Sequence, residues 1–474
     1  MRALRFGGEI CLMTIGVWAL AGHGLVNYDT LSTLVWGREI AAGGTPDLDV
    51  AVAPTPHPLA DVGAVLLAPL SNAGSGLQGQ AAMTVVLVLS FVALALLARV
   101  VFALGRDWFG TWAGVAAALI VVTRVPVLDF GARAYVDIPF IALVLAALLV
   151  ETRRPRAGWP VLALLAAAGL LRPEAWLFSF VYVGWLAWET RRFDPVFLIA
   201  LVAPVGWMLH DVLVTGDPLH SWLDTRESAQ ELNRITGIDH VPTTMPRRLG
   251  EVLRESGLLA AAIGGVLAVA WRRGERGVRI GVAAGIVAVV AFCILAAGGL
   301  PIRTRYLMLT ACILAVFAGA GLFGWMTVDD RRHRRWWAWL SAVALLAVLV
   351  TAPNQVDRIR SLRAALSTQV GIQDSLGEAV ERAPCEPYVV PNRRPVPLVA
   401  LWRDVTPGSV VVAQDGFPAS GSYVFPRRPE VARDYILDPS DLDKRVPPPP
   451  AGWSELPGSD DWRLAARCPR ASAG

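Results

Sequence analysis

The sequence predicts an all-α polytopic membrane protein of about eleven transmembrane helices, with a small extracytoplasmic α/β domain at its C-terminus. Three observations support this class. Hydrophobic residues make up 54% of the 474 residues and charged residues only 17%. Long apolar runs recur along most of the chain, and Arg-rich connections follow every second run. Such a composition excludes a soluble protein of ordinary type.

The apolar runs set the number of predicted spans. Each span needs about 20 mostly apolar residues, because the hydrocarbon core of a bilayer is about 30 Å thick. Runs of this kind lie near 8–26, 81–104, 111–125, 137–150, 158–171, 175–189, 195–213, 256–271, 279–298, 305–325 and 336–353. The formal net charge of +4 is spread over short clusters between these runs, so it indicates topology and no nucleic-acid partner.

The charge of the connections predicts the orientation. Four short Arg-rich connections alternate with longer, less basic ones, at 151–156, 189–194, 271–279 and 329–335. The positive-inside rule puts these four in the cytoplasm, together with Arg2 and Arg5 at the N-terminus. An odd number of spans then puts the C-terminus outside. Lys444 is the only lysine, and this Arg-rich, Ala-rich usage suggests a bacterial source, so we expect a multi-pass protein of the bacterial plasma (inner) membrane.

Two domains are predicted. The transmembrane domain covers 1–353 and carries external loops at 27–80 and 214–254. The extracytoplasmic C-terminal domain covers 354–474, begins with an amphipathic helical stretch at 356–382, and is long enough to hold its own core. Cys385 and Cys468 both lie in this domain and could pair in an oxidising compartment. Two unpaired thiols stay an alternative, because connectivity cannot be read from sequence.

Polar side chains gather at the predicted outer ends of the spans. They are Asp29, His57, Arg133, Asp137, Arg172, Glu174, Arg303, Arg305 and Tyr306. A charged group near a span costs free energy, so such a cluster at one face suggests a site. Carboxylates together with several Arg are the groups needed to handle an anionic, lipid-linked substrate.

Each of these residues also has a purely structural interpretation. Asp29 and Asp137 stand at predicted helix starts and could act as caps, and His57 in its Pro-rich turn could be a surface residue. Arg172 and Glu174 flank Pro173 in a tight turn, where an exposed ion pair would contribute only about 0–1 kcal/mol. Arg303 and Arg305 could extend to the membrane interface without binding a ligand.

The motifs, taken in order, resemble the GT-C superfamily of integral membrane glycosyltransferases. The similarity is to the branch of protein O-mannosyltransferases and lipid A aminoarabinose transferases, and it covers roughly residues 1–330. It is carried by Asn27-Tyr28-Asp29, Pro56-His57-Pro58-Leu59, Asp137-Ile138-Pro139, Leu171-Arg172-Pro173-Glu174 and the segment 303–306. The sequence departs from the family in two places. Family members often carry a second acidic residue directly beside the Asp of the first loop, whereas Thr30 follows Asp29 here. The Lys-Pro-Pro-Leu of the aminoarabinose branch is Pro-His-Pro-Leu here.

The resemblance implies a GT-C-like fold and a role for each matched residue. Asp29 would be the catalytic base, and Asp137 the second acidic position. Arg305, with Arg303 and Tyr306 beside it, would bind the phosphate of a donor. His57 and Asp137 would orient hydroxyls, and the remaining charged residues, Arg133, Arg172 and Glu174, would support the site.

The predicted function is an inverting glycosyltransferase that uses a polyprenyl-phosphate sugar and acts outside the membrane on a glycan, lipid or protein acceptor. The sequence requires no cofactor, although a divalent cation could bridge Asp29 and Asp137 to the phosphate. Two alternatives stay open, namely a transporter or flippase of lipid-linked sugars and a non-catalytic membrane scaffold with an external binding domain. We find no internal repeat of the kind common in transporters, which favours the enzyme.

Overall fold

The computed structural model describes residues 2–48, 52–71, 77–191, 194–437, 441 and 443–469. The chain forms two compact units, each built from separate stretches. The first unit comprises Met1–Ala21, Leu89–Leu219 and Arg234–Leu362, and the second comprises Gly22–Val88, His220–Asn233 and Arg363–Gly474. The predicted domain boundary after residue 353 falls inside a helix that contributes to both units.

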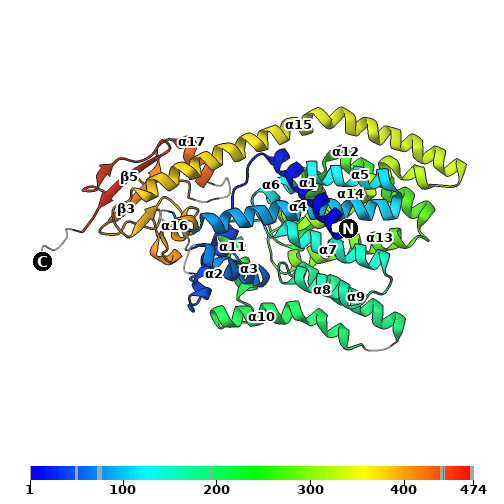
Figure 1. Cartoon of the computed structure of the whole chain (residues 1–474), viewed down its shortest axis with the longest axis horizontal. Coiled ribbons are helices and arrows are strands. Elements are labelled where there is room, and N and C mark those ends of the chain that lie inside the picture. Colours follow the sequence, from blue (N-terminus) through cyan, green and yellow to red (C-terminus); the bar gives the residue numbers. More distant parts are fainter. Residues whose placement is uncertain are drawn as a thin grey trace. The chain divides into compact units, whose positions relative to one another are not determined.

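In the described residues of the first unit, all regular secondary structure is helical (Figure 1). Its helices are α1 (Arg2–Ala21), α5 (Thr111–Thr123), α6 (Val125–Ala132), α7 (Asp137–Arg153), α8 (Trp159–Gly169), α9 (Glu174–Thr190), η1 (Pro195–Leu201), α10 (Val202–Thr215), η2 (Ile238–His240), α12 (Val241–Arg272), α13 (Arg276–Ala297), η3 (Thr304–Leu307), α14 (Met308–Phe323) and η4 (Gly324–Thr327). Two long helices, α4 (Gln80–Phe109) and α15 (Arg331–Glu381), contribute to both units.

Helix α14 forms the centre of the first unit because small residues let its neighbours approach closely. A Cβ on Gly264 of α12 would collide with the backbone oxygen of Phe317, and one on Gly321 would collide with that of Ala260. A Cβ on Gly319 would likewise meet the oxygen of Ala113 on α5. Close backbone contact through small residues is the usual way in which helices associate within a membrane.

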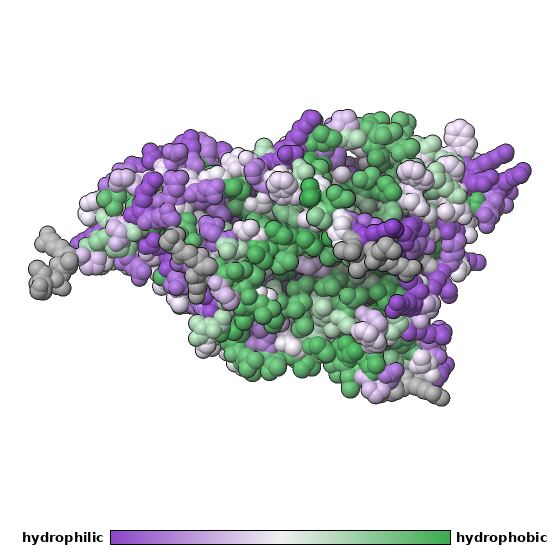
Figure 2. Space-filling view, in the orientation of Figure 1, coloured by the Kyte–Doolittle hydropathy of each residue, from purple (hydrophilic) through white to green (hydrophobic). Residues whose placement is uncertain are grey.

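A helix occupies each of the eleven predicted positions, but the helices differ in length. Among the described residues, six are long and apolar enough to cross a membrane, or seven if the pair α5 and α6, bent by 62°, counts as one span. The count of eleven therefore stays a prediction, whereas a multi-pass, mostly helical membrane protein agrees with the structure. Figure 2 shows hydrophobic surface over the helical unit and hydrophilic residues near its helix ends.

The second unit holds a five-stranded mixed sheet and short helices. The strands are β1 (Tyr388–Val390), β2 (Val411–Val412), β3 (Gly421–Pro426), β4 (Ser454–Leu456) and β5 (Trp462–Arg467), in the order β2-β1-β3-β5-β4. Strand β1 is parallel to β2 and β3, while β5 is antiparallel to β3 and β4. The helices are α2 (Tyr28–Ala41), α3 (Pro58–Ser71), α11 (His220–Glu231), α16 (Val396–Arg403), η5 (Pro407–Ser409), α17 (Pro429–Val431) and η6 (Ala432–Ile436).

One hydrophobic core joins α2 to the C-terminal part of this unit. Leu34 and Val35 of α2 pack in the same buried cluster as Leu376 of α15, Trp402 of α16 and Trp462 of β5. Arg38 of α2 adds hydrogen bonds to backbone oxygens of the C-terminal part, including one of 2.9 Å to Val405. The segment after the first predicted span therefore folds together with the C-terminal sheet.

The described tail contains the mixed α/β structure that the sequence predicts, and it contains a disulfide. Cys385 and Cys468 are bonded, with their Cα atoms 5.8 Å apart, and they stand 83 positions apart in sequence. The pairing considered for these two residues is thus confirmed, and the alternative of two free thiols is wrong. Since disulfides persist in oxidising compartments, this bond agrees with an extracytoplasmic tail.

Candidate active site

Asp29 lies in the first turn of α2, and the N-cap of that helix is Asn27. The Asn27 Oδ1 accepts a hydrogen bond from the backbone N–H of Thr30 at 3.1 Å, and its Nδ2 donates to the Thr30 Oγ1 at 2.9 Å. The capping function considered for Asp29 is therefore performed by Asn27. The Asp29 carboxylate, in the first turn of α2, also interacts favourably with the helix dipole.

His57 directly precedes α3, a helix that packs closely against α2. Its backbone oxygen accepts a hydrogen bond from the N–H of Asp61 at 2.9 Å, so His57 stands at the start of α3. The two helices touch at Gly37, where a Cβ would collide with Ala64. Both Asp29 and His57 thus begin helices of one tightly packed pair in the second unit.

Two basic residues that sequence reasoning missed lie near Tyr28, which directly precedes Asp29 in the sequence. Burial raises the pKa of the Tyr28 hydroxyl, and the negative charge of Asp29 raises it further. The positive charges of Arg393 and Arg394 lower this pKa. The Arg393 guanidinium donates to Asp441 at 2.9 Å, which holds it in place. The only sequence signal was a pair of Arg directly after the turn residue Asn392.

The first unit contains a buried charge cluster centred on Arg172. Its guanidinium donates to the Oδ1 of Asp137, at the start of α7, and to the Oε1 of Glu174, at the start of α9, at 2.6 Å. All three residues are at most 6% exposed. The ion pair between Arg172 and Glu174 that was considered for the turn is therefore present, but it is buried and not exposed, and Arg172 also pairs with Asp137 from a second helix.

Arg305 and Tyr306 of η3 extend this cluster. The Arg172 guanidinium carbon lies 4.7 Å from the centre of the Tyr306 ring, and that of Arg305 lies 5.4 Å from the same centre. The ring therefore stacks with two cations. The Thr304 Oγ1 donates to the Glu251 Oε2 of α12 at 2.7 Å, which fixes η3 in position. Glu251 is a further contributor that sequence reasoning missed.

The two remaining predicted residues occupy the edges of this region. Arg133, at the C-cap of α6, pairs with Asp129 one turn earlier at 2.7 Å. Arg303 is exposed at the N-cap of η3. Neither residue belongs to the buried part of the cluster, although Arg303 is close in sequence to Arg305.

The structure thus brings together five predicted residues of the first unit, namely Asp137, Arg172, Glu174, Arg305 and Tyr306. Asp29 and His57 belong to the second unit, so their meeting with Arg305 stays a prediction. Over the described ranges, no group of three or more His, Cys, Asp or Glu side chains could hold a metal ion.

The fold matches solved structures of ArnT from Cupriavidus metallidurans. The structure bound to undecaprenyl phosphate matches with a TM-score of 0.58 at 14% identity, and covers 98% of each chain. The apo structure matches with a TM-score of 0.57 at 15% identity over the same shares. No protein-family model matches the sequence, and neither does any curated protein.

These matches define the fold of the chain. It has an ArnT-like fold over nearly its whole length, including the C-terminal part that the sequence resemblance did not cover. The GT-C resemblance is therefore confirmed at the level of the fold.

Proposed function

We propose that the chain is an inverting glycosyltransferase that moves a sugar from a polyprenyl-phosphate donor to an acceptor hydroxyl on the external face of the bacterial inner membrane. One observation supports this most strongly. The fold matches ArnT over 98% of both chains, and that protein has been crystallised with undecaprenyl phosphate. The acceptor would be a glycan, lipid or protein of the cell envelope.

The reaction needs a base for the acceptor hydroxyl, and we assign this role to Asp29. Its carboxylate would take the proton as the hydroxyl oxygen attacks the anomeric carbon from the face opposite the phosphate. The bond between the anomeric carbon and the phosphate oxygen would break, which inverts the configuration. A positioned base of this kind contributes roughly 10²–10⁴-fold in rate.

The leaving phosphate needs cations, and we assign Arg305 and Arg303 to it. Arg172 is already held between Asp137 and Glu174, so its charge serves the cluster. Arg305 lies against the ring of Tyr306. The planar guanidinium matches phosphate oxygens, keeps its charge, and would stabilise the negative charge that develops as the bond breaks.

The remaining site residues would position the substrates. Asp137 and His57 would orient sugar or acceptor hydroxyls, and Arg133, Arg172 and Glu174 would hold the surrounding groups. A divalent cation between Asp29 and Asp137 would be an addition to this scheme. It is not needed, because Arg305 and Arg303 already supply positive charge to the phosphate.

A transfer assay tests the proposal. Purified protein in nanodiscs would receive a set of labelled polyprenyl-phosphate sugars together with envelope lipids and glycans. We expect labelled acceptor to form together with an equal amount of sugar-free polyprenyl phosphate. A transporter would move the donor across the membrane of a proteoliposome without breaking its sugar–phosphate bond, and that result would contradict the proposal.

A further inference from the structure

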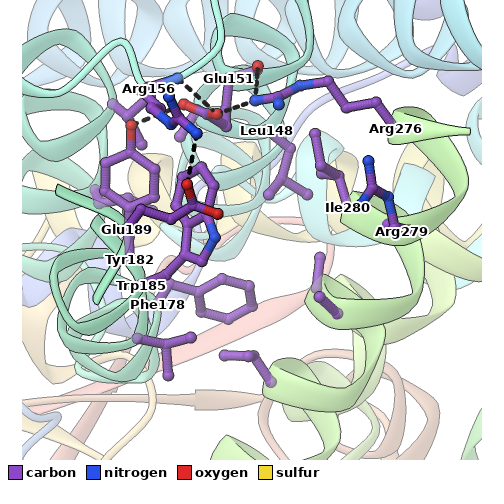
Figure 3. A pocket seen from close by; sticks show the side chains of 17 residues that line it. Leu148, Glu151, Arg156, Phe178, Tyr182, Trp185, Glu189, Arg276, Arg279 and Ile280 are labelled. Carbon is purple, nitrogen blue, oxygen red and sulfur yellow. Dashed lines mark hydrogen bonds and ion pairs between the residues drawn. The ribbon is translucent and has the colours of Figure 1, made fainter. Parts of the chain in front are cut away.

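A second polar region of the first unit surrounds a cavity of about 530 Å³. Helices α7, α8, α9 and α13 supply its walls, which are largely apolar and include Leu148, Phe178 and Ile280 (Figure 3). Charged side chains line one part, namely Glu151, Arg156, Glu189, Arg276 and Arg279. The volume falls within the range of small-molecule sites. We call this region the inner-edge cavity.

The inner-edge cavity lies far from the candidate active site. About four turns of α7, or about 21 Å along its axis, separate Glu151 from Asp137. Its charged residues come from the Arg-rich connections that the positive-inside rule puts at the cytoplasmic surface. The cavity is therefore expected at the level of the lipid headgroups of the inner leaflet, with its apolar walls reaching into the hydrocarbon.

Glu151 builds the polar end of the cavity. It is 5% exposed, accepts hydrogen bonds from the backbone N–H of Arg156 at 2.9 Å and the hydroxyl of Tyr182 at 2.7 Å, and pairs with Arg276. Arg156 in turn pairs with Glu189 (Figure 3). Both carboxylates are thus paired with cations, Glu151 in a buried position and Glu189 in an exposed one.

Arg279 supplies the positive charge that these pairs do not neutralise. The described part of the chain gives its guanidinium no hydrogen bond or ion pair, and its side chain is exposed at the cavity. It stands in the first turn of α13, whose N-cap residue, Glu275, makes no capping hydrogen bond with its side chain. The N-terminus of a helix attracts anions through its backbone N–H groups, so the helix adds to the charge of Arg279.

The walls of the inner-edge cavity reach the surface between α9 and α13. Val181 and Ala283 line the cavity, and both are exposed. An apolar opening at a membrane-facing surface admits an acyl chain, and a soluble anion has no apolar group that would fill it. Basic pockets between transmembrane helices on the cytoplasmic side are a known way of binding anionic headgroups.

We propose that the inner-edge cavity binds an anionic diacyl phospholipid of the inner leaflet. The phosphate lies at Arg279 and the N-terminus of α13, and an acyl chain lies along the apolar walls. This inference concerns the opposite end of the helices from the candidate active site, and it does not depend on the proposed function.

Native mass spectrometry of the delipidated full-length protein tests the proposal. The probes are phosphatidylglycerol, zwitterionic phosphatidylethanolamine and polyprenyl phosphate. We expect tight binding of one phosphatidylglycerol and weaker binding of phosphatidylethanolamine. Arg279→Gln should weaken phosphatidylglycerol binding about fivefold, because one cation near an anionic headgroup is lost. Ala283→Trp, which fills the exposed wall, should weaken binding of both phospholipids.

Arg273→Gln is the matched control, because Arg273 is exposed at the same membrane edge but does not line the cavity. This variant removes the same charge and should bind phosphatidylglycerol like the wild type. Equal losses in the two Arg variants would show a general surface-charge effect and overturn the proposal. Unchanged binding in Arg279→Gln would overturn it as well, as would an Arg279-dependent site that takes polyprenyl phosphate and no diacyl phospholipid.

Discussion

Arg172 shows how the surroundings of a single residue determine its role. One guanidinium holds two carboxylates from α7 and α9, and all three groups are buried. Removing the cation would leave two buried negative charges without a partner, which is strongly unfavourable. The cluster therefore positions the helix ends beside η3, where Arg305 stacks on Tyr306.

We predict that Arg172→Met lowers the free energy of unfolding by about 3–5 kcal/mol, because it breaks a buried ion cluster by removing one partner. The matched control is Arg133→Met, which removes a partly exposed pair with Asp129 and should cost less than about 1 kcal/mol. Denaturant unfolding in detergent micelles measures both. Equal small losses would show that the Arg172 cluster contributes little to stability.

We predict that Asp29→Asn lowers turnover by about two orders of magnitude or more while donor binding changes little, because the base is lost but the shape is kept. Asn27→Ala is the control, since it removes the α2 cap. It should cost about 1 kcal/mol of stability and leave most of the turnover. An Asp29→Asn enzyme with near wild-type turnover would move the base elsewhere, with Asp137 the next candidate.

At the scale of elements, hydrophobic runs were the most informative part of the sequence. A helix occurs at each predicted position, because about 20 apolar residues in a bilayer must satisfy their backbone groups within the segment. Short or bent helices such as α5 and α6 could not be predicted, since tertiary packing decides where a helix breaks. The contact of α2 with α16 was also hidden, because it joins segments more than three hundred positions apart.

Tertiary packing also explains which site residues the sequence could predict and which it could not. Asp137, Arg172 and Glu174 were predictable, because the turns that carry them adjoin strongly apolar runs whose ends face the same side. Arg393 and Arg394 were not, since only the folded second unit brings them near Tyr28. Glu251 was missed because it lies on a helix well before its partner Thr304 in sequence.

We predict that Cys468→Ser destabilises the second unit by about 4 kcal/mol, because the disulfide closes a long loop and restricts the unfolded chain. A reducing agent should reproduce this loss in the wild type and have no further effect on the variant. Cys293→Ser, which removes a free cysteine, should change stability far less. Proteolysis of the tail at increasing denaturant measures the difference. Equal resistance in all three proteins would contradict the prediction.

At the scale of the whole molecule, the proposed function depends on which membrane surface each region faces. The Arg-rich connections are predicted to share one membrane surface, and the candidate active site and the disulfide-bonded tail are predicted to share the other. The inner-edge cavity and the Arg172 cluster lie at opposite ends of α7, so one helix connects the two surfaces. The orientation itself remains a prediction from charge.

We predict that a cysteine introduced at Ala419, an exposed position two residues before Gly421, in a background without the three free cysteines, is labelled by a membrane-impermeant reagent added to intact cells. A cysteine at Gly274, between α12 and α13, should be labelled only after the cells are opened. This pattern follows from the positive-inside rule, because the 271–279 connection is Arg-rich. The reverse pattern would put the proposed site on the wrong side for an extracytoplasmic transferase.

The measurement that tests the central claim most directly is an experimental structure of the protein in nanodiscs with polyprenyl phosphate. We expect density for the lipid phosphate within hydrogen-bond distance of the Arg305 guanidinium, with the Asp29 carboxylate facing the same space across a gap wide enough for a sugar ring. Such an arrangement would join residues of the first and second units in one site. A phosphate bound elsewhere, or Asp29 and Arg305 in separate, non-communicating regions, would contradict the proposed function.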